Sequence, residues 1–109
     1  MIEIQSREQL ETAANAATAY PVLIWYSARW CAPCRRIDSI AVQNAATDAK
    51  FTFAHCDVDK VSLAVHLHGI DRIPTFILFH HGKELSRLNS ATTSEITAWI
   101  AAQAMRTAK

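Results

Sequence analysis

Two cysteines three positions apart are the residues of this chain best suited to chemistry. Cys31 and Cys34 enclose Ala32 and Pro33, and thiols at this spacing at a helix start can close into a disulfide and reopen with little backbone movement. A helix N-terminus offers unpaired N–H groups and the positive pole of the helix dipole, both of which favour a thiolate. The spacing therefore predicts Cys31 as the attacking nucleophile. Cys34, within the first helical turn and expected to be better covered than Cys31, is predicted to be the resolving thiol.

The same two cysteines could instead form half of a zinc site. A closed zinc site needs four ligands, and the chain adds only one further cysteine and scattered histidines, without a second Cys-X-X-Cys pair. We therefore predict no metal. Cys56 is expected to be a small, buried apolar residue, and the solvated surface is expected to hold His66, His68, His80 and His81.

The composition is typical of a single globular domain. With 109 residues, of which 50% are hydrophobic, the chain can bury one core, and we expect one domain over residues 1–109. The net charge of +1 argues against nucleic acid as a partner, and the apolar run from Tyr20 to Trp25 is too short to span a membrane. The odd number of cysteines and the acidic residue in the opening Met1–Ile4 segment argue against a secreted scaffold with a signal peptide, so we expect a cytoplasmic location.

The elements that must position the cysteines alternate between strands and helices. The strand at 22–26 is apolar on both faces, as expected for a central strand covered by helices on two sides. Pro33 suits the first turn of a helix that begins at the cysteine pair. The predicted order begins with a strand at 2–4, in which Ile2 and Ile4 alternate with polar residues, a helix from Ser6 and Gln9 towards Ala17, and the strand at 22–26. The helix from the cysteine pair follows, with Ile37, Ile40, Ala41 and Ala45 at helical spacing. The rest is a strand over 51–58, a short helix from Asp59 through Leu67 with Gly69 in the left-handed position after its end, a hairpin of 76–79 with 85–88 around His81 and Gly82, and a last helix capped by Thr92 and Glu95.

Two motifs resemble those of one family. The segment from Trp30 to Arg35, Trp-Cys-Ala-Pro-Cys-Arg, resembles the thioredoxin active-site sequence Trp-Cys-Gly-Pro-Cys-Lys, and Ile73-Pro74-Thr75-Phe76 resembles the cis-proline segment of that family. The resemblance covers nearly the whole chain. It implies an α/β thioredoxin fold, a central mixed five-stranded sheet flanked by four helices, with a cis peptide bond before Pro74. It also implies a target-binding surface made of Trp30, Ala32, Pro33, Ile73 and Pro74.

The resemblance further implies protein-disulfide reduction in cell redox homeostasis. No bound cofactor is then expected, because the redox-active group is the Cys31–Cys34 disulfide itself and electrons arrive from NADPH through a thioredoxin reductase. The implied partners are that reductase and disulfide-containing targets, such as ribonucleotide reductase or peroxiredoxins, and we expect a monomer. Two alternatives stay open: a dedicated oxidase or isomerase of the same fold, and a non-catalytic module that uses the fold as a subunit or processivity clamp.

The chain departs from the family at four positions. Trp25 stands where thioredoxins usually hold a buried aspartate, and His55 where bacterial members commonly hold a lysine. A lysine facing a tryptophan would be desolvated without a counter-charge, whereas a histidine can be neutral. The acceptor of the Cys34 proton is therefore open among water, His55 and the departing Cys31 sulfur. Ala32 and Ser90 each replace a glycine and are expected to narrow or reshape the target-binding groove.

Overall fold

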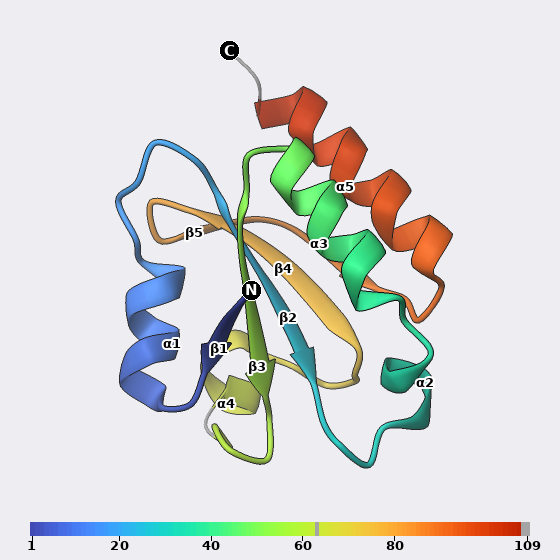
Figure 1. The fold of residues 1–109 in the computed structure, drawn as a ribbon. Helices are drawn as coiled ribbons and strands as arrows, with labels where there is room; N and C mark the ends of the chain where they lie inside the picture. Colours follow the sequence, from blue (N-terminus) through green and yellow to red (C-terminus); the bar gives the residue numbers. More distant parts are fainter. Residues whose placement is uncertain (63, 108–109) are drawn as a thin grey trace.

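The computed structural model describes residues 1–62 and 64–107. In this part of the chain five strands and five helices follow one another (Figure 1). The strands form one mixed sheet, as predicted. The elements, in chain order, are β1 (Ile2–Ile4), α1 (Arg7–Ala14), β2 (Val22–Ser27), α2 (Ala32–Arg35), α3 (Ser39–Asp48), β3 (Thr52–Asp57), α4 (Ala64–His68), β4 (Thr75–His80), β5 (Lys83–Asn89) and α5 (Thr93–Thr107).

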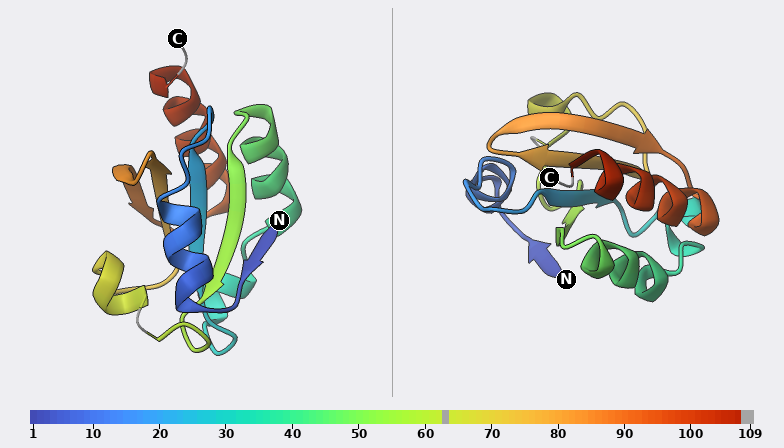
Figure 2. Two further views of the ribbon diagram at one scale, coloured as in Figure 1. Left: turned by 90° about the vertical axis from the view of Figure 1, so that its left-hand side faces the viewer. Right: turned by 90° about the horizontal axis from the view of Figure 1, so that it is seen from above.

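The sheet has the strand order β1-β3-β2-β4-β5, so β2 is central, as its apolar sequence predicts. β1, β3 and β2 run parallel, whereas β4 is antiparallel to β2 and β5 is antiparallel to β4. Every residue of β2 is buried. Helices α1 and α4 cover one face of the sheet and α3 and α5 cover the other (Figures 1 and 2).

Side-chain alternation along β2 divides the core into two clusters. Ile24 and Tyr26 point toward α1 and α4, while Leu23 and Trp25 point toward α3 and α5. Leu23, Ile24 and Tyr26 are each 0% exposed, and full burial of such a side chain stabilises the fold by about 1.5–3 kcal/mol. β2 is therefore held firmly in the core. Its polar last residue, Ser27, lies at the end of the sheet from which the chain continues to the cysteines.

The predicted single helix after the cysteine pair is in fact two helices, which is why the described chain contains five helices and not four. α2 ends at Arg35, and Asp38 begins α3 by accepting hydrogen bonds from the backbone N–H groups of Ile40 and Ala41, each at 3.1 Å. An aspartate at this position satisfies N–H groups that a continuous helix would bond internally, so the helix restarts there. Ile40, predicted from its spacing to share the apolar face, is 72% exposed.

The boundaries of two other helices differ from the prediction. Ser6 caps α1 as expected, accepting from Gln9 N at 3.1 Å, but the helix ends at Ala14 instead of continuing towards Ala17. α4 begins only at Ala64, because the Asp57 carbonyl oxygen accepts turn-forming bonds from the N–H groups of Lys60 and Val61. The left-handed residue predicted after α4, Gly69, is confirmed by its φ of 61°.

The predicted hairpin is confirmed. β4 and β5 pair antiparallel around His81 and Gly82, which have φ values of 52° and 80°. Positive φ at both central residues is the geometry of the tight turn whose twist matches that of the strands. The hairpin places the start of β4 and the end of β5 side by side, at the same end of the sheet as the end of β2.

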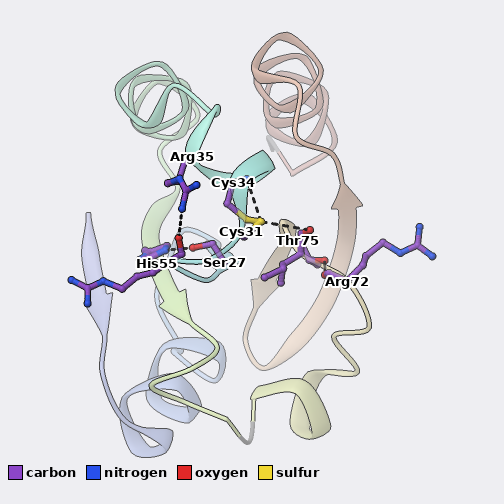
Figure 3. Close-up of a disulfide and its surroundings, with 9 residues drawn as sticks. Ser27, Cys31, Cys34, Arg35, His55, Arg72 and Thr75 are labelled. Carbon is purple, nitrogen blue, oxygen red and sulfur yellow. Dashed lines mark hydrogen bonds between the residues drawn. A yellow bond between two sulfur atoms is a disulfide. The ribbon is translucent and has the colours of Figure 1, made fainter.

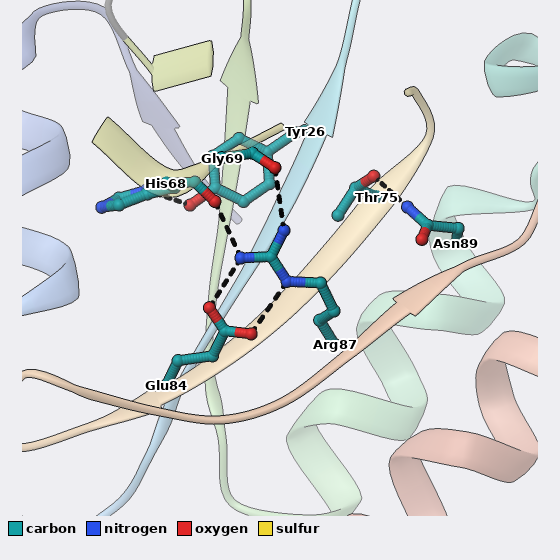
Figure 4. Close-up of polar contacts among 7 residues, drawn as sticks. All are labelled: Tyr26, His68, Gly69, Thr75, Glu84, Arg87 and Asn89. Atoms are coloured by element: carbon teal, nitrogen blue, oxygen red, sulfur yellow. Dashed lines mark hydrogen bonds and ion pairs between the residues drawn. The ribbon is translucent and has the colours of Figure 1, made fainter. Parts of the chain in front are cut away.

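His68 was predicted to lie on the surface, and that prediction is wrong. It is half-buried, its Nδ1 lies 2.6 Å from the Tyr26 hydroxyl oxygen, and its ring packs edge-on against Tyr26. Arg87 of β5 holds this end of α4 by donating to the carbonyl oxygens of His68 at 2.7 Å and Gly69 at 3.1 Å (Figure 4). Glu84 completes the cluster with a two-point ion pair to Arg87.

Candidate active site

The two cysteines lie at the end of the sheet where β2 and β3 finish and β4 begins. Cys31 and Cys34 form a disulfide with a Cα–Cα distance of 5.3 Å (Figure 3). The chain leaves β2 at Ser27 and turns, with Cys31 N donating to the Ala28 carbonyl oxygen at 3.1 Å, before α2 begins. The central, fully buried strand thus fixes the position of the pair.

The Cys31 sulfur lies between two backbone groups. As the cap of α2, it accepts a hydrogen bond from Cys34 N at 3.2 Å, and it lies 4.0 Å from the Ile73 carbonyl oxygen. α2 has only four residues, so the N–H group of Cys34 is the main local source of positive potential at this sulfur, more than the dipole of a long helix. Such an N–H group favours the thiolate over the thiol.

The two cysteines are equally covered, contrary to the expectation that Cys34 would be the better covered. Each is 4% exposed, because the two sulfurs cover one another and share a cluster with Ala28. Val58 and Ile73 pack against the same cluster. The surroundings of the disulfide are therefore largely apolar.

The loop before β4 forms the opposite wall of the site. The Ile73-Pro74 bond is cis, which confirms that expectation. The buried Thr75 hydroxyl donates to the Arg72 carbonyl oxygen at 2.5 Å and accepts a hydrogen bond from the side-chain amide of Asn89. The turn that carries Ile73 and Pro74 is thus tied to both strands of the hairpin.

The remaining residues of the predicted binding surface lie around this wall. Trp30 is 65% exposed, and Ala32 and Pro33 are exposed at the start of α2. Two shallow grooves meet at Arg72 and Ile73. One is lined by Trp30, Val58, Ile70, Asp71, Arg72 and Ile73, and the other by Pro33, Arg72, Ile73, Pro74, Asn89, Ser90 and Ala91.

Ser90 lines the second groove and also helps to start α5. Its hydroxyl donates to a Glu95 carboxylate oxygen at 3.0 Å and accepts from Thr92 N at 3.1 Å. Thr92 directly precedes α5, as predicted, and its carbonyl oxygen accepts from Ile96 N at 3.0 Å, but Glu95 is hydrogen-bonded to Ser90 instead of Thr92.

Comparison with known proteins agrees with this geometry. A family model described as Thioredoxin matches residues 2–102. The chain belongs to the thioredoxin family. It is a thiol–disulfide oxidoreductase of that family with a Cys-X-X-Cys pair, Cys31–Cys34, as its redox-active disulfide.

Individual thioredoxins show how far the similarity extends. Thioredoxin-2 of Dictyostelium discoideum is 34% identical over 86 residues, covering 79% of this chain and 94% of the relative. The solution structure of the oxidised thioredoxin from Plasmodium falciparum has a TM-score of 0.84 at 25% identity, covering 95% of this chain and 98% of that one. A TPR repeat-containing thioredoxin of Oryza sativa subsp. japonica is 25% identical over 103 residues. That match covers 93% of this chain but only 32% of the longer protein.

The position of the thioredoxin aspartate is occupied here by a packed aromatic ring. Trp25 is buried, stacks on Phe53 and Phe76 with centroid distances of 6.4 and 5.6 Å, and meets the edge of His55 at 5.1 Å. Trp25 and His55 are direct neighbours in the register of β2 and β3, as the resemblance implied. The indole N–H of Trp25 has no hydrogen-bond partner among the described residues.

Cys56 is buried, as predicted, and free of the disulfide. Its side chain points to the face covered by α1 and α4 and belongs to a different packed cluster from the pair. Burial, followed by the nearby charges of Asp57 and Glu3, raises the pKa of its thiol to about 12. This thiol is therefore protonated and unreactive at neutral pH.

Sequence reasoning missed two hydroxyl groups of this site. Thr75 was quoted only as part of a motif, and Ser27 was not considered, although a serine that ends an otherwise apolar strand is a visible signal. Ser27 Oγ is hydrogen-bonded to His55 Nε2 (Figure 3).

Over residues 1–62 and 64–107 we find no group of three metal-ligating side chains, and no helix there is long and apolar enough to cross a membrane.

Proposed function

We propose that this chain is a protein-disulfide reductase in which Cys31 attacks a target disulfide and Cys34 resolves the mixed disulfide. Attack by the Cys31 thiolate breaks the target S–S bond and releases one target sulfur as a thiolate. Cys34 then bonds to Cys31, and the second target sulfur leaves. The target gains two electrons and the cysteine pair loses them.

One observation carries this proposal. The Cys31 sulfur lies 3.2 Å from the Cys34 N–H nitrogen and 4.0 Å from the Ile73 carbonyl oxygen, and two grooves meet at Ile73. The N–H group supports a thiolate at Cys31, and the backbone of Ile73 offers hydrogen-bonding groups to an extended target segment. Trp30, Ala32, Pro33, Ile73 and Pro74 supply the target-binding surface in this proposal.

Family membership supports the wider setting that we propose. A single domain over residues 1–109 would act as a cytoplasmic monomer and receive electrons from NADPH through a thioredoxin reductase. Its targets would be disulfide enzymes of the kind of ribonucleotide reductase or peroxiredoxins.

Reduction of insulin disulfides, followed by turbidity, tests the function. We expect wild type and Cys56→Ser to be active and Cys31→Ser to be inactive. Cys34→Ser should accumulate a covalent mixed disulfide with insulin, whereas Cys31→Ser should not. Insulin reduction that survives in Cys31→Ser would contradict the proposed nucleophile, and a double Cys31/Cys34→Ser variant that keeps the cellular role would indicate a non-catalytic module.

The reduction potential separates a reductase from an oxidase or isomerase. We expect equilibration with glutathione, followed by alkylation, to give a value at least as reducing as the cytosolic glutathione poise of about −220 to −320 mV. A value well above that range would favour the oxidase or isomerase.

The target-binding surface is tested by Trp30→Ala. We expect KM for insulin to rise while the rate with a small disulfide reagent stays unchanged, since the reagent does not need the indole surface. Tyr20→Ala is the matched control, because Tyr20 is another exposed aromatic residue but precedes β2 at the opposite end of the sheet.

A further inference from the structure

Three polar side chains form a continuous hydrogen-bonded chain across β1, β3 and β2. Glu3 Oε2 lies 2.9 Å from His55 Nδ1, and His55 Nε2 is hydrogen-bonded to Ser27 Oγ. The side chain of Glu3 is 51% exposed and that of His55 is 20% exposed, whereas Ser27 is 5% exposed. The chain thus leads from solvent at the edge of the sheet to a buried hydroxyl group.

The buried end of this chain lies one residue before the cluster that holds the cysteines. Ser27 is followed by Ala28, which belongs to the same packed cluster as Cys31 and Cys34. Figure 3 shows the Ser27 side chain directed toward His55, on the side of the disulfide where β2 and β3 end. The other members of the cysteine cluster, Val58 and Ile73, are apolar.

The hydrogen-bonding capacity of the three groups fixes the direction of their bonds. A carboxylate only accepts hydrogen bonds, so the bond to Glu3 requires a proton on His55 Nδ1. In a neutral imidazole the other nitrogen, Nε2, is then an acceptor, and the Ser27 hydroxyl donates to it. The lone pairs of Ser27 Oγ remain free to accept a proton from a further donor.

The resolving step needs such an acceptor. Cys34 must lose its proton to attack the mixed disulfide, and it is 4% exposed in apolar surroundings that disfavour a thiolate. Trp25, at the centre of the same face, offers no acceptor, because an indole N–H only donates.

We propose that Ser27, His55 and Glu3 form a proton relay for Cys34, and this rests on the proposed function only for the direction of electron flow. As the Cys34 sulfur bonds to Cys31, its proton passes through one water molecule to Ser27 Oγ, because the two side chains are not in hydrogen-bond contact in the oxidised structure, and the Ser27 proton passes to His55 Nε2. The bond between Cys31 and the target breaks, and the target sulfur leaves with the electron pair. His55 becomes an imidazolium beside the Glu3 carboxylate and returns its proton to water.

Other charged groups lie on the same side as this relay. Asp57 follows His55 by two residues on β3 and therefore points to the same face of the sheet. Arg35 extends from α2 on this side, where its guanidinium donates to the Arg29 carbonyl oxygen at 2.6 Å (Figure 3). Glu3 is the charged group in direct contact with His55.

The test separates the two thiol reactions kinetically. Reduced protein is mixed with excess dithiobis(nitrobenzoate), and release of the coloured thiolate is followed by stopped flow. The first release reports attack by Cys31 and depends on reagent concentration. The second reports attack by Cys34 on the mixed disulfide and does not. Cys56 stays silent because its thiol is protonated and buried.

Ser27→Thr and Ser27→Val are a matched pair, because threonine and valine have nearly the same shape and only threonine keeps the hydroxyl. We expect the second release in Ser27→Val to be about 10-fold to 100-fold slower than in Ser27→Thr at neutral pH, within the range of general acid–base catalysis. The first release should be equal in the two variants. Equal second-release rates in the pair would overturn the relay.

His55→Gln and Glu3→Gln test the outer part of the relay and do not enlarge the buried Ser27 side chain. His55→Gln should slow the second release by about 10-fold or more and leave the first release unchanged, because glutamine cannot take up the relayed proton as an imidazole does. Glu3→Gln should slow the second release by about 3-fold, and His66→Gln, at an exposed histidine, should leave it unchanged. An unchanged second-release rate in His55→Gln would refute the relay, whereas loss of the first release in wild type would refute Cys31 as the nucleophile.

Discussion

Thr75→Val removes one hydroxyl group that holds the wall of the active site. Thr75 is 1% exposed, and its hydroxyl donates to the Arg72 carbonyl oxygen at 2.5 Å and accepts from the Asn89 amide. Valine has nearly the same shape, so the substitution deletes the two hydrogen bonds and leaves the packing against β2 in place. We expect a less stable protein whose target-binding loop is less well positioned.

The size of the effect follows from those two bonds. A typical intramolecular hydrogen bond contributes about 0.5–1.5 kcal/mol, and two of them about 1–3 kcal/mol. Asn89 is exposed, so its amide can turn to water, which places the expected loss at the lower end, about 1–2 kcal/mol. In a domain of this size such a loss lowers Tm by roughly 5–10 °C.

Urea unfolding of the oxidised protein measures the loss of stability, and insulin reduction measures its effect on the site. Thr52→Val is the matched control, because Thr52 is an exposed threonine of β3. We expect KM for insulin to rise in Thr75→Val and to stay constant in Thr52→Val. A loss below about 0.5 kcal/mol would refute the assigned contribution of the two bonds. An unchanged KM would refute the role of the loop in binding.

Three further predictions concern the rest of the fold. Burial, and then Arg87, lowers the pKa of His68 in the folded state, so the unfolded chain binds more protons and the free energy of unfolding should fall as the pH drops below about 6.5. Urea unfolding at several pH values should show a weaker fall in His68→Gln. Because the pKa of Cys56 is raised to about 12, the reduced native protein should be alkylated at Cys31 and Cys34 alone at pH values near 8, and at Cys56 only in denaturant. Mass spectrometry counts the alkyl groups, two in the native protein and three in the denatured one. Gly82→Ala should lower the free energy of unfolding in urea by about 1–2 kcal/mol, because φ is 80° and a Cβ would lie 2.9 Å from Asn15 Oδ1. A smaller loss of stability than in Gly69→Ala, where a Cβ meets nothing within 4 Å, would contradict a role for the Asn15 contact.

Local sequence patterns predicted the parts of the fold that depend on neighbouring residues. The alternation in β1, the apolar run of β2 and the tight turn at His81 and Gly82 each act over a few positions, and each is confirmed. The cysteine pair was also visible, because its spacing is a property of one short segment. Helix boundaries were predicted less well, since one side chain, Asp38, is enough to divide a helix.

The contacts that sequence reasoning missed join residues far apart in the chain. Tyr26 meets His68 across 42 positions, and Ser27 meets His55 across 28. Both depend on the register of strands that are not consecutive, because a shift of one residue would turn each side chain to the other face. The sequence contained the right residue types, and only the pairing of β2 with β3 brings Ser27 and His55 together.

The sheet also explains why the polar groups lie where they do. At the centre of the face covered by α3 and α5, Trp25 is enclosed by Phe53 and Phe76, and a carboxylate there would lose its hydration without a charged partner. In the proposed relay the group that takes up the Cys34 proton is a neutral hydroxyl, and the carboxylate in contact with His55 is Glu3, whose side chain is 51% exposed. His55 is charged only while it holds the relayed proton, in direct contact with that carboxylate. The arrangement therefore moves a proton away from Cys34 without an ion at the position of Trp25, where desolvation would destabilise the fold.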